Sequence, residues 1–182
     1  AQLSGEASIT SQSNSSSTNG ASDANTYSSY VTGIFSYGTT VVGDSASIAG
    51  TATVNETANA RTVGDTPTLD TAKAQVGHQN ALIGGISLYN GNTTVGKDLT
   101  LKGTATLTQN SVAQGINSNT SSNIDNDYLS GIRTDERIVS AGGNIDFTGN
   151  VVGLSTSQAS SATGDAESEI LIDAAGGAFQ GD

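Results

Sequence analysis

The chain has 182 residues and a formal net charge of −11 at pH 7, from six Lys and Arg against seventeen Asp and Glu. No basic cluster interrupts this acidity, so we predict no nucleic-acid partner. The absence of Cys excludes a disulfide framework and thiol chemistry, and no run approaches the roughly 18 apolar residues of a membrane span, so we predict no membrane insertion.

Apolar side chains are scarce for a folded chain of this size. Leu, Ile, Val and Phe make up 36 of the 182 residues, while 23 are Gly and only one is Pro. A strongly charged chain with so few large apolar residues tends to stay disordered unless stacked backbone ladders or neighbouring subunits order it. The chain does not begin with Met, which fits a secreted protein whose leader has been removed. We therefore expect a secreted, extracellular or cell-surface protein.

Along the chain, the first feature is a strand pattern with a central glycine that occurs four times, in residues 3–9, 48–54, 101–107 and 147–153. The central glycines are Gly5, Gly50, Gly103 and Gly149, which are 45, 53 and 46 residues apart. Alternate side chains on a strand share a face, and one face of each segment reads large apolar, Gly, then Ala or Val. Gly inside a strand is tolerated where another backbone approaches closely, so the pattern predicts a thin, half-buried strand.

A second strand precedes three of these segments, in residues 30–37, 82–89 and 128–134, and residues 169–173 supply a fourth. Between the two strands a turn recurs in which Gly is followed by Asp or Asn, as at residues 42–44, 95–98, 142–144 and 180–182. Residues 63–67, which include Pro67, indicate a loop. No sustained 3.6-residue period occurs, so helix should be minor.

These patterns predict an all-β fold of tandem repeats of about 45–53 residues. We expect a β-solenoid-like or β-sandwich stack that is completed by a strand from a neighbouring subunit. The alternative is a four-bladed, propeller-like closed ring, whose first strand completes its last blade. A thin Gly/Ala strand with few aromatic residues favours the stack.

Residues 1–182 then form a single repeat-built domain. Its strand pairs are residues 30–54, 82–107 and 128–153, residues 1–10 are a donor strand, and residues 169–182 are the acceptor end. The glycine-centred strand at the N-terminus is the strand that would follow residues 169–182 in the repeat. Copies of the chain would therefore complete one another head to tail. The residues expected to mediate self-assembly are Leu3, Gly5, Ala7, Ile9, Ile170, Ile172 and Phe179.

The predicted function is accordingly that of a structural subunit of an extracellular filament or biofilm matrix, with itself as partner. The alternative is a self-contained cell-surface adhesin or carbohydrate-binding module, for which surface glycans are a further partner. A third option is an ice- or mineral-binding surface, because Thr51 and Thr53 occupy the same repeat positions as Thr104 and Thr106.

Catalysis has little support in the sequence, and we predict that the chain is not an enzyme. The one histidine, His78, lies in a polar turn, and with so many serines a Ser–His–Asp pairing has no specificity. No motif surrounds any pair of carboxylates, and no Gly pair opens a helix with the Lys and Ser or Thr of a phosphate loop.

Calcium is the one metal that the sequence suggests. Asp44, Asp98 and Asp182, with Asn144, recur at one position of the repeat, and oxygen ligands in a column would suit Ca²⁺. Asp125 and Asp127 form a second candidate site. The competing interpretation is that each Asp only closes an Asx turn.

In its composition and repeat pattern, the chain looks like bacterial or archaeal extracellular matrix and surface proteins. Over residues 141–147 only, the segment Ala-Gly-Gly-Asn-Ile-Asp-Phe resembles the repeats of filamentous-haemagglutinin-type β-helices.

Overall fold

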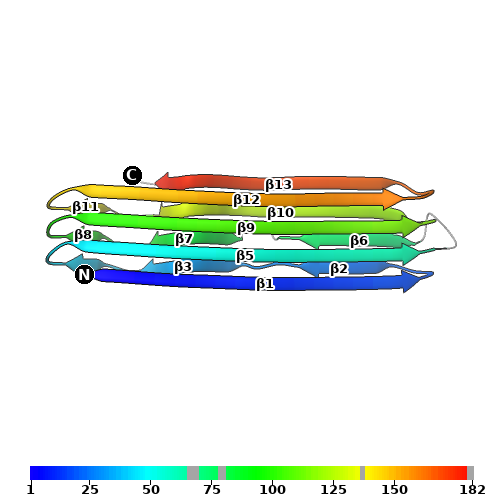
Figure 1. Ribbon diagram of the computed structural model, residues 1–182, viewed down its shortest axis with the longest axis horizontal. Helices are drawn as coiled ribbons and strands as arrows, with labels where there is room; N and C mark the ends of the chain where they lie inside the picture. The colour runs from blue at the N-terminus through cyan, green and yellow to red at the C-terminus, as the bar shows by residue number, and fades with distance from the viewer. Residues whose placement is uncertain (65–69, 78–80, 136–137, 180–182) are drawn as a thin grey trace.

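The chain winds into a β-solenoid of four successive coils. The computed structural model describes residues 1–64, 70–77, 81–135 and 138–179, which form strands, turns and bends. In Figure 1 the long strands β1, β5, β9 and β12 lie one above another in a front layer, and the remaining longer strands form a second layer behind it. Among the described residues, no helix could cross a membrane.

Each of the first three coils has two long sides and one short side. The first is β1 (Gln2–Thr18), β2 (Ser22–Thr26), β3 (Tyr30–Tyr37) and β4 (Thr40–Val42). The second is β5 (Ala46–Val63), β6 (Thr71–Val76), β7 (Leu82–Tyr89) and β8 (Thr93–Val95). The third is β9 (Leu99–Ile116), β10 (Asn119–Asp135) and β11 (Val139–Ala141), and the fourth is β12 (Ile145–Ser161) with β13 (Ala166–Phe179).

All the sheets are parallel and stack coil upon coil. Sheet A has the strand order β1-β5-β9-β12, sheet B contains β2, β3, β6, β7, β10 and β13, and the short sheet C has the order β11-β8-β4. In sheet A the register pairs Gly5 with Gly50, Gly50 with Gly103, and Gly103 with Gly149. The glycine spacing of the sequence therefore gives the actual register of the coils.

These glycines lie where the two main sheets come closest together. A Cβ atom at Gly50 would collide with the carbonyl oxygen of Gly85, and one at Gly103 would collide with that of Gly131. The backbones of sheets A and B therefore pack directly on each other here, as expected for a strand-interior glycine. We call this narrow level of the solenoid the glycine waist.

Three apolar clusters fill the interior in order along the strands. The inward residues of β5 show the order: Ala46 and Ile48 belong to the first cluster, Ala52 and Val54 to the second, and Ala58 and Ala60 to the third. Gly50 separates the first cluster from the second, and the buried Glu56 separates the second from the third. The first two clusters hold Ile, Leu and Val, whereas the third is mostly Ala.

Serine hydroxyls join the two sheets at the level of the third cluster. Ser122 Oγ donates a hydrogen bond to Ser111 O (2.8 Å), Ser157 Oγ donates to Ser122 O (2.7 Å), and Ser168 Oγ donates to Ser157 Oγ (2.9 Å). Ser111 and Ser122 are fully buried. Buried hydroxyls are tolerated when they are hydrogen-bonded, so this part of the solenoid folds with few large apolar side chains.

The structure confirms an all-β, solenoid-like stack of repeats. The ring alternative is wrong, because β1 and β12 lie at opposite edges of sheet A and do not meet. The glycine-centred segments are confirmed as strands, but each continues through the polar residues that follow, to a length of 17 or 18 residues.

The second strands predicted at residues 30–37, 82–89 and 128–134 lie side by side in sheet B, with Leu82 between Tyr30 and Tyr128. The fourth was misplaced. Ile170 pairs with Ile124, and Ala174 pairs with Leu129, so residues 174–179 rather than 169–173 oppose the 128–134 segment. The predicted loop at 63–67, His78 and the turn at 180–182 lie wholly or mainly outside the described residues.

Replacing Gly103 by Val should destabilise the protein by more than about 3 kcal/mol, because the new side chain has no room against the Gly131 backbone. Thermal unfolding followed by circular dichroism measures the loss. The matched control is Gly153→Ala on the end strand β12, where the nearest atom to an added Cβ is Leu129 Cδ2 at 3.6 Å. The free energy of unfolding of that variant should stay within about 1 kcal/mol of the wild-type value. Equal losses for the two variants would contradict the close backbone packing at the glycine waist.

Candidate assembly interface

Each end of the solenoid presents the edge of both main sheets. At one end, β1 pairs with β5 alone in sheet A, and at the other end β12 pairs with β9 alone. In sheet B the end strands are β2 and β3 in the first coil and β13 in the fourth (Figure 1). Among the described strands, none covers these edges, and an edge with free N–H and C=O groups is a template for another strand.

The end coils also expose residues of the interior rows. Leu3, Ile48, Leu101 and Phe147 form one row across the four coils. Their exposed fractions are 56%, 8%, 0% and 38%, so the row is buried in the middle and open at both ends. Water-exposed apolar surface of this kind favours a further layer.

The other predicted assembly residues fall on the same two ends. Gly5, Ala7 and Ile9 lie on β1, where Ala7 is half-buried and Ile9 is exposed. At the far end Ile170 is 49% exposed, Ile172 packs against the third cluster, and Phe179 pairs through its backbone with Thr134. Residues 1–10, however, belong to sheet A and residues 169–179 to sheet B. The predicted donor and acceptor segments therefore lie at opposite ends of the solenoid but in different sheets, and the edge of sheet A opposite β1 is β12.

A buried carboxylate lies in the interior between the second and third clusters. Glu56 is 2% exposed, and its Oε2 accepts a hydrogen bond from Gln109 Nε2 (2.9 Å). Ser155 Oγ in turn donates to Gln109 Oε1 (3.3 Å). Burial raises the pKa of the Glu56 carboxyl, and the hydrogen bonds only partly offset that effect.

Asp44 and Asp98, which were predicted to lie in one column, are out of register by one residue. The register pairs Ala46 with Leu99, which places Asp44 beside Lys97 and Asp98 beside Ser45. Lys97 Nζ lies 2.7 Å from Asp44 Oδ1, and the hydrogen bond from Lys97 lowers the pKa of the Asp44 carboxyl.

The remaining predicted ligands are also dispersed. Asp98 Oδ1 accepts a hydrogen bond from the backbone N–H of Asn144 in the next coil (2.9 Å). Asp125 has one buried carboxylate oxygen without a hydrogen-bond partner, whereas Asp182 and the side chain of Asp127 lie outside the description. Across the described residues no group of three acidic or His side chains could hold a metal ion, and calcium stays a prediction.

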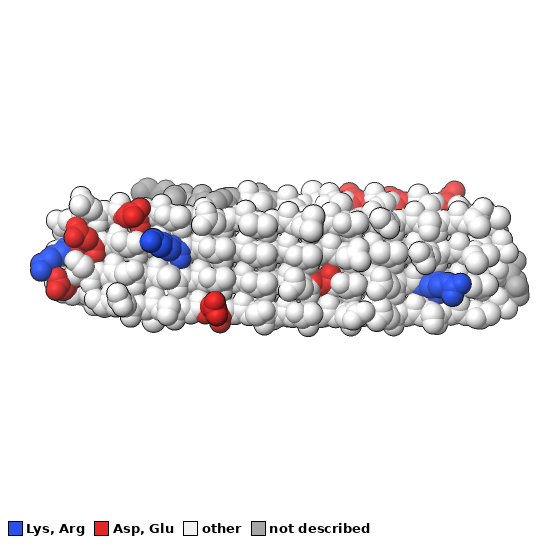
Figure 2. Space-filling model, viewed as in Figure 1, with Lys and Arg blue, Asp and Glu red and all other residues white. Residues whose placement is uncertain are grey.

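The outward face of sheet A is broad and carries few charges, as Figure 2 shows. Thr51 and Thr53 lie directly beside Thr104 and Thr106, as predicted from the repeat. In the outer coils the Thr51 position becomes Glu6 and the Thr104 position becomes Asn150, so the threonine array is two coils wide. Ice or mineral binding stays a prediction.

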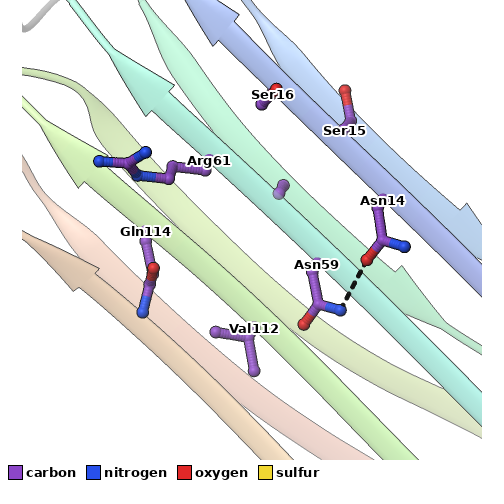
Figure 3. Close-up of a pocket in the computed structure, with 8 residues that line it drawn as sticks. Asn14, Ser15, Ser16, Asn59, Arg61, Val112 and Gln114 are labelled. Carbon is purple, nitrogen blue, oxygen red and sulfur yellow. Dashed lines mark hydrogen bonds between the residues drawn. The ribbon is translucent and has the colours of Figure 1, made fainter.

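A shallow groove crosses the same face towards the C-terminal ends of the strands (Figure 3). Asn59 Nδ2 donates a hydrogen bond to Asn14 Oδ1 (2.8 Å) in this groove. The other lining residues are Ser15, Ser16, Ala60, Arg61, Val112 and Gln114. The groove contains neither a nucleophile–base pair nor a pair of carboxylates, and nothing in it indicates a reaction.

Comparisons with protein-family models, with curated proteins and with solved structures each found no match. Function is therefore inferred from the chain's own geometry. The expectation that the chain is not an enzyme stays a prediction.

Replacing Glu56 by Gln should raise the free energy of unfolding at pH 7 by on the order of 1 kcal/mol, because it removes a buried charge and keeps an acceptor for Gln109. The folded state holds the Glu56 proton more tightly than the unfolded state. The contribution of the Glu56 carboxyl to the free energy of unfolding is therefore fully present below the ordinary Glu pKa of about 4.3. This contribution is lost as the pH rises through the pKa of the folded state.

Urea unfolding of the two proteins between pH 4 and pH 8 measures this difference. The gain from Glu56→Gln should shrink towards pH 4. Glu6→Gln removes the same charge from an exposed position of β1 and serves as the control. If the two variants show the same pH dependence, the buried carboxylate does not have the role described.

Proposed function

We propose that the protein is a structural subunit of an extracellular filament, in which copies stack end to end and continue one β-solenoid. The observation that supports this most strongly is the match between the two ends. Equivalent residues of all four coils are in register, and both end coils expose the rows that the middle coils bury. The extracellular location rests on composition alone.

Stacking by this route continues the existing geometry without a change of direction. All four strands of sheet A are parallel, so β12 of one copy can pair with β1 of the next in the same sense. The contact joins two different surfaces, and such head-to-tail contacts generate open filaments when they do not close into a ring. Each added ladder bond contributes roughly 0.5–1.5 kcal/mol net, and these edges are long.

The interior rows of the two ends are also complementary in size. Ala7 stands in the row that ends at Val151, and Ile9 stands in the row that ends at Gly153. At a junction the small Ala7 would therefore meet Val151, and the larger Ile9 would meet Gly153. Leu3 would meet Phe147, which buries two side chains that are half-exposed in a single copy.

This arrangement revises the donor strand predicted from the sequence. Residues 1–10 would not leave their own molecule, because the whole of β1 is already paired with β5. The junction instead adds two sheets at once: β1 joins β12 in sheet A, while β2 and β3 join β13 in sheet B. Residues 169–179 would contact the second half of the first coil rather than residues 1–10.

Replacing Leu3 by Lys should block assembly, since the junction would bury an ammonium group without a partner. Light scattering should show wild-type particles that grow with protein concentration. The variant should need at least about a 100-fold higher concentration, which corresponds to about 3 kcal/mol per junction. Leu3 is exposed in the single copy, so the fold itself should persist.

The matched control is Ser4→Lys, which adds the same charge one residue further along β1. Ser4 lies on the outward face, in the row where Lys102 already stands, so this variant should assemble like the wild type. A wild type that stays monomeric at every concentration, or a Leu3→Lys variant that assembles normally, would overturn the proposal.

The charged residues on sheet B give a second test. It asks which residues of β13 in one copy pair with which residues of β2 in the next. Asp23, Lys73, Ser121 and Glu167 form one outward row. Stacking would place Glu167 of one copy beside Asp23 of the next, and adjacent like charges are destabilising. Glu167→Lys should therefore lower the concentration needed for assembly about fivefold at low salt, with a smaller gain at high salt.

Glu169→Lys is the matched control, because it makes the same charge change two residues along β13. Glu169 lies in the row of Asn123, Gln75 and Asn25, so it would face an uncharged residue across the junction. Light scattering at several salt concentrations compares the two variants. Equal gains would mean that only net charge matters and that the proposed register is wrong.

A further inference from the structure

Aromatic residues gather on the outward face of sheet B. Four of the five tyrosines lie there, together with one phenylalanine and one arginine. We define the aromatic patch as these six residues: Tyr30, Phe35, Tyr37, Tyr89, Tyr128 and Arg133. They come from β3, β7 and β10, which lie in successive coils behind the front layer in Figure 1.

The register brings these residues together in rows. Phe35, Ser87 and Arg133 form one row, and Tyr37, Tyr89 and Asp135 form the next. Tyr30 is 70% exposed, Tyr37 71% and Tyr128 44%. These three side chains are therefore largely or partly exposed to solvent.

Arg133 lies between the aromatic rings of the patch and contacts two of them. Its guanidinium carbon lies 4.6 Å from the Tyr128 ring centroid and 5.5 Å from that of Tyr89, both within cation–π range. The Phe35 and Tyr89 ring centroids are 5.6 Å apart. Arg133 Nη2 also lies 3.0 Å from Asp135 Oδ2, so the charge of the guanidinium is balanced locally.

Two hydroxyls beneath these side chains have no hydrogen-bond partner. Ser87 is fully buried and Ser130 is 4% exposed, and the Oγ atom of each is unpaired. Both approach the outward side of Gly84, where an added Cβ would lie 2.8 Å from Ser87 Oγ and 3.5 Å from Ser130 Oγ. Native structures leave few buried polar atoms unsatisfied, so two of them around Gly84 indicate a missing polar partner.

We propose that the aromatic patch binds a neutral polysaccharide chain. Sugar rings combine apolar C–H faces, which stack on tyrosine rings, with hydroxyls that can pair with Ser87, Ser130 and Arg133 once the guanidinium moves aside. A polyanion is disfavoured by the net charge of −11 and by the Arg133–Asp135 pair. The aromatic patch of a second copy would leave the two serine hydroxyls unpaired.

The aromatic patch faces outward from the solenoid, so it stays accessible whether or not copies stack end to end. The proposal is therefore independent of filament formation. It requires only that β3, β7 and β10 keep their register.

Co-sedimentation with insoluble β-1,4-glucan, poly-N-acetylglucosamine and α-1,4-glucan tests the proposal. The wild type should pellet with at least one of them, and Tyr30→Ala and Tyr128→Ala should each weaken binding at least about tenfold. Tyr27→Ala is the matched control, because Tyr27 is 62% exposed but lies outside the aromatic patch. Ser130→Ala should weaken binding without lowering the melting temperature, since its hydroxyl has no partner to lose.

Three results would overturn the proposal. The first is a wild type that pellets with none of the neutral polysaccharides, or that binds only soluble polyuronate. The second is an equal loss of binding for Tyr27→Ala and Tyr30→Ala. The third is a change of particle mass in the Tyr30→Ala and Tyr128→Ala variants with unchanged pelleting, which would make the aromatic patch a contact between copies.

Discussion

The in-register parallel ladder between successive coils is the constraint on which the rest of this structure depends. It places glycine over glycine at the waist, where the backbones of sheets A and B pack directly on each other. A slip of one residue would put Ala49 or Thr51 where Gly50 must lie and would turn the interior row outward. The glycine column thus fixes the register that both the interior rows and the end surfaces require.

The ladder also explains how a chain with so little apolar surface folds. Backbone hydrogen bonds run along strands of 17 or 18 residues, and serine hydroxyls bridge the sheets where the interior is narrow. The apolar clusters fill the interior between the glycine waist and the serine hydrogen bonds. Such a solenoid is stabilised mainly by contacts between neighbouring coils, so the middle coils are complete and the end coils each lack one neighbour.

Much of this could be predicted from the sequence, because glycine spacing reports a backbone contact directly. The turn aspartates were misaligned because residue type, rather than distance from the waist glycine, was used to match them: Asp98 lies five residues before Gly103, but Asp44 lies six before Gly50. Residues 169–173 were misplaced because their apolar run was matched to the apolar residues of 128–134, whereas the register pairs Ile170 with Ile124, earlier along β10. The aromatic patch was missed because Gly85 and Ile86 both face inward, which breaks the alternation that sequence reasoning assumes.

The central claim is that the ladder continues from one copy into the next. Helical reconstruction of filaments by cryo-electron microscopy tests it most directly. With about 4.8 Å between coils, four coils predict an axial rise of about 19 Å per subunit, with Gly149 of one copy paired with Gly5 of the next. A rise unrelated to four coils, or a junction in which Gly149 faces a residue other than Gly5, would contradict the account.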